Sequence, residues 1–245
     1  MNEAETQRRR SAELRDQGLR TGDVEAMLGA VAAASAALAE ETDPRSLALL
    51  GAARTVLGEY ASDPAWLEAA VESYRRALAA SDGEDRARMH RNLGAVLSLL
   101  GRLTDSPSAL AEAVGHCRAA LKVYAPYGLD WAIAQNNLAE ALRVLGERTG
   151  DTDALDASVA SCQAALAVTT RTASPRDWAM TTTNLANALA ALGGQARLTE
   201  AVGLYRAALE ALDDPRLAPA IRHNLDRAEA QLALPQYHPH RHCQS

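Results

Sequence analysis

The chain has 245 residues and a formal net charge of −6, and 48% of its residues are hydrophobic, yet only 4% are aromatic and none is phenylalanine. Its length suits one or two domains, and its few aromatic residues argue against an all-β barrel or sandwich. Alanine makes up roughly a fifth of the residues, which favours closely packed helices. The negative charge disfavours indiscriminate binding to nucleic acid or to anionic lipid, because both depend on clustered Lys and Arg.

The first ten residues, the lack of a long apolar segment and the cysteines predict a cytoplasmic protein. Residues 1–10 are polar and charged, without the apolar core of a signal peptide. No stretch of about 18 uncharged apolar residues could span a bilayer, so we expect no membrane partner. The three cysteines, Cys117, Cys162 and Cys243, are too few for a disulfide scaffold in a chain of this size.

One helical stripe recurs along the whole chain. Four residues, almost all apolar, stand at offsets 0, 4, 7 and 11, the spacing of one face of an α-helix. Successive copies begin 40, 43, 45 and 43 residues apart. The five copies begin at Met27, Leu67, Leu110, Leu155 and Leu198. A pattern repeated at this period predicts a repeat architecture.

A second type of helix alternates with these stripes. Three copies carry Asn-Leu-Gly or Asn-Leu-Ala, beginning at Asn92, Asn137 and Asn184, and an earlier copy begins at Leu50. Each has a Leu-Gly pair seven residues after its first Leu, and we expect that glycine to end the helix in the left-handed conformation. The glycines concerned are Gly58, Gly101, Gly146 and Gly193.

Capping residues followed by proline mark the starts of helices independently. The pairs are Asp43-Pro44, Asp63-Pro64, Ser106-Pro107, Ser174-Pro175 and Asp214-Pro215. Taken with the stripes, they predict eleven helices, the first over 3–20 and the last over 216–233. No part of the chain favours a strand or a separate domain.

These motifs resemble the tetratricopeptide repeat (TPR). The resemblance rests on Asn-Leu-Gly, on Leu-Gly seven residues later, and on Ala-Val-x-x-Tyr-x-x-Ala-Leu over 201–209. The segments Asp130-Trp131-Ala132 and Asp177-Trp178-Ala179 are similar to the long-period bacterial variant. The resemblance implies an all-α fold, an α-solenoid of about five helix-turn-helix repeats over residues 1–234 with a C-terminal capping helix, followed by a His-rich tail over 235–245.

The repeat length departs from the usual 34 residues. The repeats here span 40 to 47 residues, and we expect the extra residues in the turns between paired helices, as in 102–106 and 147–151. HEAT-like repeats have the longer period and remain the alternative fold. In either case the units stack into a curved solenoid with one concave surface.

The TPR resemblance implies a binding module rather than an enzyme, with a protein or peptide partner in the concave groove. The first helix of each pair lines that groove in the family, and Asn and Arg side chains there could bind a peptide backbone or an acidic tail. The candidate residues are Arg91, Asn92, Asn136, Asn137, Glu140, Arg143, Asn184, Asn187, His223 and Arg227, with Asn224 continuing the ladder formed by Asn92, Asn137 and Asn184. The alternatives are that the Asn ladder holds the repeat geometry and that the charges form an ordinary solvated face.

Two further hypotheses belong to other classes of function. A small-molecule-binding protein or enzyme could use Glu140, Arg143 and His223 for acid–base chemistry in the groove. A divalent transition metal could bind the tail, where imidazole and thiolate ligands gather; otherwise we expect no cofactor. The tail ligands are His238, His240, His242 and Cys243, and an unstructured tail is the alternative.

The remaining conspicuous side chains are interpreted as packing residues. Cys117 and Cys162 occupy the position of Tyr74 and Tyr205 in other stripes, which predicts core thiols. The equivalent Trp131 and Trp178 are interpreted as packing residues at repeat junctions, with an aromatic anchor for a ligand as the alternative. Neither the partner nor the oligomeric state can be predicted from the chain.

Overall fold

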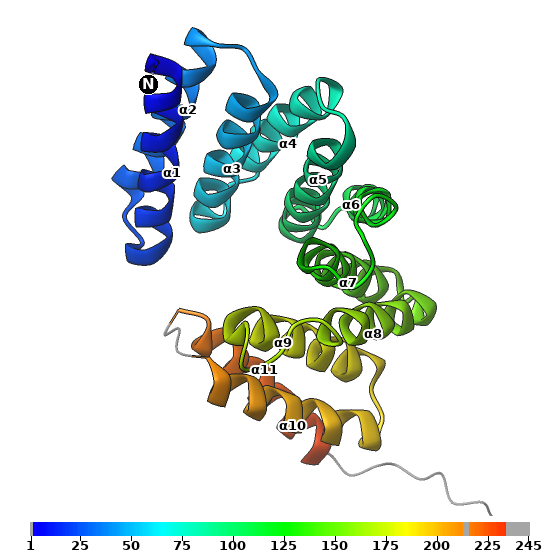
Figure 1. Ribbon diagram of the computed structural model, residues 1–245. Helices are drawn as coiled ribbons and strands as arrows, with labels where there is room; N and C mark the ends of the chain where they lie inside the picture. Colours follow the sequence, from blue (N-terminus) through cyan, green and yellow to red (C-terminus); the bar gives the residue numbers. More distant parts are fainter. Residues whose placement is uncertain (1, 213–215, 234–245) are drawn as a thin grey trace, which may run out of the picture.

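The computed structural model describes residues 2–212 and 216–233, and all regular structure in these ranges is α-helical. The helices run in chain order along the molecule (Figure 1). Their bounds are α1 (Glu3–Thr21), α2 (Val24–Glu40), α3 (Pro44–Ala61), α4 (Pro64–Ala79), α5 (Gly83–Leu103), α6 (Pro107–Leu121), α7 (Leu129–Thr149), α8 (Thr152–Leu166), α9 (Pro175–Leu192), α10 (Gln195–Ala211) and α11 (Ala218–Ala233). The eleven predicted helices are confirmed within these ranges.

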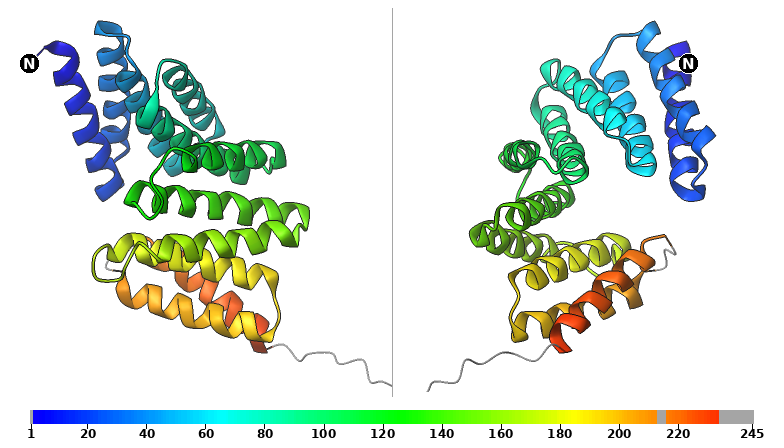
Figure 2. Two further views of the ribbon diagram at one scale, coloured as in Figure 1. Left: turned by 45° about the vertical axis from the view of Figure 1, so that its right-hand side comes forward. Right: turned by 180° about the vertical axis from the view of Figure 1, so that it is seen from behind.

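The helices pack as five consecutive pairs, from α1–α2 to α9–α10, and α11 closes the array. Every helix contacts the next one, and the odd-numbered helices also contact one another in series, from α1·α3 to α9·α11. Within the described chain the even-numbered helices do not pack closely on one another in this way, although an ion pair between Arg75 and Glu112 joins α4 to α6. The odd helices therefore form the inner, concave row and the even helices the outer row of a curved solenoid (Figure 2). The predicted all-α solenoid of five helix pairs with a capping helix is confirmed.

Small residues set the close approach within each pair. A Cβ atom added to Gly51 would lie 2.9 Å from Tyr74 Cε2, and one added to Gly94 would collide with Cys117 Sγ. The equivalent inner positions on α7 and α9 are Ala139 and Ala186, both completely buried. The Asn-Leu-Gly/Ala motif thus supplies the narrow site against which the outer helix packs, which favours the tetratricopeptide-like interpretation over the HEAT-like one.

The expectation that the Leu-Gly glycines end their helices is wrong in three of four repeats. Gly193 does end α9, but its φ of 68° and ψ of −172° do not give the expected left-handed helical conformation. Gly58, Gly101 and Gly146 lie inside their helices. A Cβ at each would come within 2.7–2.8 Å of Leu67, Leu110 or Leu155 of the partner helix. These glycines are kept for close helix contact, so the helices continue beyond them.

The extra residues of each repeat also lie elsewhere than expected. Instead of forming long turns over 102–106 and 147–151, the inner helices α5 and α7 extend to Leu103 and Thr149. Longer connections join successive pairs, over 122–128 and 167–174. The period of 40 to 47 residues therefore comes from long inner helices and from links between pairs.

Most of the predicted caps are present. Asp43, Asp63 and Ser106 each accept a hydrogen bond from a backbone N–H in the first turn of the following helix. Helix α9 begins at Pro175 as expected, but the Ser174 side chain makes no capping bond. The pair Asp214-Pro215 lies outside the described residues, and α11 begins two residues later than predicted, at Ala218.

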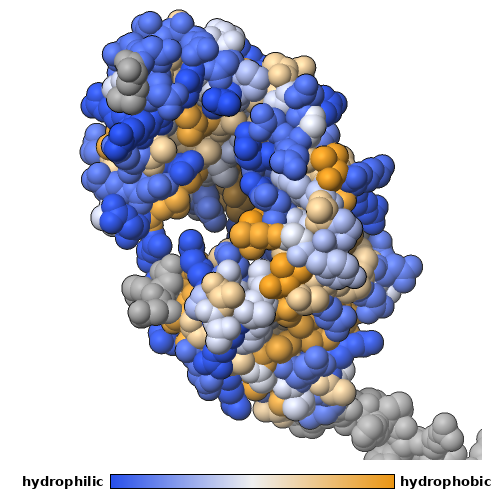
Figure 3. Space-filling model, in the orientation of Figure 1, coloured by the Kyte–Doolittle hydropathy of each residue, from blue (hydrophilic) through white to orange (hydrophobic). Residues whose placement is uncertain are grey.

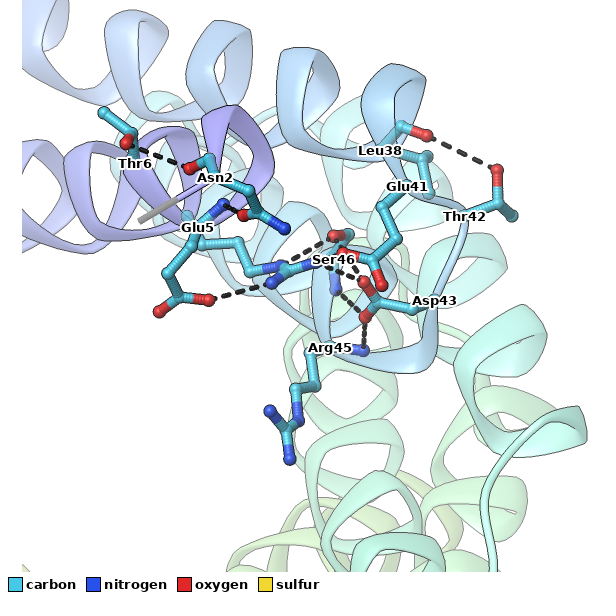
Figure 4. A network of polar contacts seen from close by, with 10 residues as sticks. Asn2, Glu5, Thr6, Leu38, Glu41, Thr42, Asp43, Arg45 and Ser46 are labelled. Atoms are coloured by element: carbon cyan, nitrogen blue, oxygen red, sulfur yellow. Dashed lines mark hydrogen bonds and ion pairs between the residues drawn. The ribbon is translucent and has the colours of Figure 1, made fainter.

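The cap of α3 belongs to a wider polar network around Arg8 (Figure 4). The Arg8 guanidinium pairs with Glu5 at 2.8 Å, with Asp43 at 2.6 Å and with Glu41. Burial opposes ionisation of Asp43, but the backbone N–H groups of Ser46 and Arg45, together with Arg8, hold its pKa below the usual value. This network fixes α1 against the start of α3.

The core consists mainly of Ala and Leu side chains between the two rows of helices. One cluster centres on α4, α5 and α6 and another on α9 and α10. The alanines allow the helices to approach, and the leucines fill the remaining volume, so the unusual composition follows from the architecture. In the described part of the chain, no helix is both long and apolar enough to cross a membrane.

Candidate functional site

The concave face lies on the inner row of helices. A hollow opens between the first helix pairs and the last helices (Figure 3). All ten predicted site residues lie on four inner helices, α5, α7, α9 and α11. The prediction therefore placed these residues on the correct row, and their contacts decide which of them can face a ligand.

Side-chain amides join successive inner helices. Asn184 Nδ2 on α9 donates to Asn136 Oδ1 on α7 at 3.1 Å. Asn187 Oδ1 accepts two bonds, from Asn224 Nδ2 on α11 at 3.0 Å and from the Tyr205 hydroxyl on α10 at 2.6 Å. Amides of the Asn ladder thus link α7, α9 and α11 at the concave face.

Arg143 on α7 carries two carboxylate partners on its own helix. Its Nη2 lies 2.9 Å from Glu140 Oε1, and its Nη1 lies 2.7 Å from Glu147 Oε2. The Arg143 side chain is only 12% exposed. Burial acts against its charge, but Glu140 and Glu147 more than offset this, so the pKa of Arg143 lies above its usual value.

A pocket of about 760 Å³ opens beside this cluster, between the later halves of α7, α9 and α11. Three of the ten predicted site residues line it, Arg143, Asn187 and Arg227, together with Asn224 of the predicted Asn ladder. The other lining residues are Arg102, Gly146, Glu147, Gly150, Thr152, Leu155, Ala190, Ala191, Tyr205, Ala228 and Gln231. We call this set the concave pocket. Arg143 is already paired with Glu140 and Glu147, so Arg102 and Arg227 are the lining arginines that favour an anionic or hydrogen-bond-accepting ligand.

Seven of the ten predicted site residues, His223 among them, do not line the concave pocket. Arg91 is paired with Asp130 and lies 6.0 Å from the centre of the Tyr124 ring, at the link between α6 and α7. Asn92 and Asn137 are half-buried elsewhere on the inner row. Asn136 and Glu140 are engaged with Asn184 and Arg143, and Asn184 itself joins α9 to α7.

The residues proposed for acid–base chemistry are not gathered at one point. Glu140 and Arg143 neutralise each other, whereas His223 is exposed on α11 and does not line the concave pocket. The pocket therefore holds no imidazole from the described residues. The polar groups that line it are mainly arginine guanidinium groups and side-chain amides.

Sequence reasoning missed Arg102, Tyr205 and Gln231. Arg102 and Gln231 lie near the C-terminal ends of α5 and α11, beyond the Asn motif that guided the prediction. Tyr205 belongs to a core stripe on α10, yet its hydroxyl reaches the pocket through Asn187. The recurrence of polar residues in the last turns of the inner helices could have indicated Arg102 and Gln231.

The predicted packing residues have the following surroundings. Cys117 and Cys162 are buried free thiols, and burial raises the pKa of each to about 12. The Trp131 ring lies 5.4 Å from that of Tyr127, and the Arg171 guanidinium lies 5.8 Å from the Trp178 ring. Both tryptophans are half-buried beside the links between pairs.

The predicted metal ligands of the tail lie outside the described residues. They are His238, His240, His242 and Cys243. Within residues 2–212 and 216–233, no group of three or more His, Cys, Asp or Glu side chains is arranged to hold a metal ion. Metal binding by the tail stays a prediction.

Comparisons with known proteins add little to this description. No protein-family model matches the chain, and no curated protein matches it. Among solved structures, the chain is similar to the TPR2AB domain:pHSP90 complex of yeast Sti1, with 13% sequence identity and a TM-score of 0.32, over 94% of this chain and 98% of that one. The fold assignment therefore rests on the packing of this chain's own helices.

Proposed function

We propose that the chain is a non-enzymatic protein-interaction module that holds a peptide or protein segment in its concave groove. The concave pocket is the anchoring part of that groove, and its lining residues Arg102 and Arg227 favour an acidic segment. Asn187 carries the proposal. Both acceptor positions of its Oδ1 are occupied by Tyr205 and Asn224, and its two amide N–H donors bond to no described residue, so they are left for the carbonyl or carboxylate oxygens of a partner.

The substitution Asn187→Asp tests this assignment with little change of shape. Aspartate keeps the oxygen that accepts from Tyr205 and Asn224, but it lacks the amide donors. Peptides selected from a random displayed library should bind the variant at least about tenfold more weakly in calorimetry, a loss of about 1.4 kcal/mol. The control is Asn92→Asp, which adds the same charge on α5 outside the pocket. If the selected peptides bind both variants as tightly as the original chain, the concave pocket is not the binding site.

A small-molecule ligand is the second candidate, because the volume of the concave pocket lies in the range of small-molecule sites. A thermal-shift screen with small carboxylates and phosphates tests it. A saturable rise in melting temperature that Asn187→Asp abolishes would favour this function over peptide capture. Two statements stay predictions from the sequence: that the protein is cytoplasmic, and that its repeat is of the long-period bacterial type.

A further inference from the structure

A second arginine, Arg54 on α3, is half-buried without a carboxylate. Its Nη1 donates to the Ala69 carbonyl at 3.0 Å and to the Ser73 hydroxyl at 2.7 Å, both on α4. Its Nε is buried and has no acceptor. Arg54 forms no ion pair with any residue in the described ranges. Burial and the nearby charge of Arg76 lower its pKa, so the fold itself does not compensate this charge.

The three following inner helices carry leucine at the position of Arg54. The repeat offsets align Arg54 with Leu97, Leu142 and Leu189, and all three are buried. Leucine there costs nothing in desolvation, whereas an unpaired charge in a half-buried position is unfavourable. The arginine is therefore an exception within the repeat and calls for a compensating group.

The next repeat shows which surface this position faces. Leu97 lines a groove of about 250 Å³ on the outer side, between α4 and α6. The rim of that groove is closed by an ion pair between Arg75 and Glu112 at 2.7 Å. Glu68 and Val71 of α4 complete the same side. Position 97 thus forms the floor of a groove between two outer helices.

One repeat earlier, the corresponding surface lies between α2 and α4 and has a different chemistry. The positions of Glu68, Val71, Arg75 and Glu112 are taken there by Leu28, Val31, Ser35 and Ala69. Leu28 is 39% exposed, and α2 carries no charged residue between Glu25 and Glu40. We give the name outer groove to these positions together with Arg54, which is equivalent to Leu97 in the floor of the next groove. The positions on α2 and α4 that correspond to its walls are uncharged, whereas Arg54 carries a charge without a carboxylate partner among the described residues.

We propose that the outer groove is a second docking surface, for a partner protein segment that presents a carboxylate between aliphatic side chains. The Arg54 Nη2 atom is neither bonded to a described residue nor buried, so it is the atom that meets the carboxylate. The aliphatic neighbours of that carboxylate would cover Leu28 and Val31 and exclude water, which strengthens the ion pair. This surface is on the opposite side of the solenoid from the concave pocket and does not depend on it.

The substitution Arg54→Leu tests whether the arginine is kept for binding. Leucine is the residue of the sister repeats, so the variant should fold, and its melting temperature should rise by roughly 2–4 °C, the shift that about 1 kcal/mol produces in a chain of this size. A fall in melting temperature would show that the hydrogen bonds from Arg54 to α4 explain its presence, and the proposal would be wrong.

Binding is tested by NMR titration of the ¹⁵N-labelled full chain with the peptide acetyl-Leu-Glu-Leu-amide. The amide signals of Leu28, Ser35 and Ala69 should shift saturably, and Arg54→Leu should weaken this response at least tenfold. Acetyl-Leu-Gln-Leu-amide is the neutral control, and inorganic phosphate is the control for general attraction of anions. Equal responses to either control, or no response to the acidic peptide, would overturn the proposal. The variant Asn187→Asp should respond like the original chain, so failure here is separate from failure of the concave pocket.

Discussion

The outer groove and the concave pocket contain the same residue in opposite electrostatic situations. Arg54 and Arg143 are both half-buried arginines on inner helices. Two carboxylates raise the pKa of Arg143 against its burial, whereas burial and a neighbouring cation lower the pKa of Arg54. The charge of Arg143 is paired within the fold, whereas the charge of Arg54 is left for a binding partner.

The difference follows from neighbours on the same helix. The residues three before and four after Arg143 are Glu140 and Glu147, and both reach its guanidinium. The same positions around Arg54 are Gly51 and Gly58. Both glycines are needed because a Cβ there would press against Tyr74 or Leu67 at 2.8–2.9 Å. Close helix packing therefore requires glycine at positions 51 and 58, where a carboxylate on α3 could otherwise have paired with Arg54.

The largest effect on stability is expected from removing both carboxylate partners of Arg143, which leaves it without an ion pair, like Arg54. The double substitution Glu140→Gln with Glu147→Gln should lower the free energy of unfolding by about 2–3 kcal/mol, measured by urea denaturation. The expected loss of free energy is smaller than for a fully buried ion pair, because Glu147 is 38% exposed and its charge is partly screened by solvent. The control is Glu13→Gln in the exposed pair with Arg9, which should change little. A loss no greater than that of the control would mean that the two arginines do not differ as described.

The comparison assumes that positions in different repeats are equivalent, and Gly94→Ala tests this assumption. The added methyl group meets Cys117 Sγ in the core, so the variant should lose about 1–2 kcal/mol of stability after allowing for the gain in helix propensity. Gly115 on α6 has nothing within 4 Å of a Cβ. Gly115→Ala should therefore stabilise the chain by about 0.5–1 kcal/mol in the same urea titration. Equal effects of the two substitutions would contradict the packing role assigned to the inner glycines.

These glycines also show how far the sequence could predict the fold. The stripes and caps are local signals, and they predicted all eleven helices with ends close to those observed for α1 and α11. Whether a Leu-Gly pair ends a helix depends on what approaches the glycine. At Gly101 the neighbour is Leu110, which packs against the bare backbone inside the helix. Such a contact between helices cannot be read from one helix alone.

The concave pocket was predictable to a similar extent. The motif placed Asn187 and Arg143 on the inner row because it fixes the face of each helix. It could not show that Arg102, from another pair, lines the same pocket, because that depends on how sharply the solenoid curves. It also could not show that Arg91 pairs with Asp130, which the link between α6 and α7 brings close.

A smaller change should give Arg54 the partner that its own helix lacks. Ala69 corresponds to Glu112 of the next repeat, so Ala69→Glu should place a carboxylate in the outer groove beside Arg54. The expected gain in stability is about 0.5–1 kcal/mol, the value of a partly exposed ion pair, and the variant should no longer respond to the acidic tripeptide. Ala69→Gln is the matched neutral control. If Ala69→Glu keeps the response to the peptide, the carboxylate site is not at Arg54.

The last prediction concerns the third pair, α5–α6, which lies between the two regions compared. His90 Nδ1 on α5 lies 2.8 Å from His116 Nδ1 on α6, so one proton is shared between two half-buried rings. Burial lowers the pKa of both rings. The charges of His116 and Arg86 lower the pKa of His90 further, whereas Glu112 partly offsets the effect of burial on the pKa of His116.

The sign of the resulting pH dependence follows from these directions. In the unfolded chain both rings titrate near pH 6.5, and in the folded chain they titrate at a lower pH. As the pH falls below about 6.5, the unfolded chain binds more protons than the folded one, so stability decreases, by at most about 1.4 kcal/mol per pH unit for each such proton. Urea titrations between pH 7.5 and 5.5 should show this slope, and His90→Gln with His116→Gln should reduce it. An unchanged slope would mean that folding does not lower the pKa of these two rings and that acid does not destabilise the chain through the third helix pair.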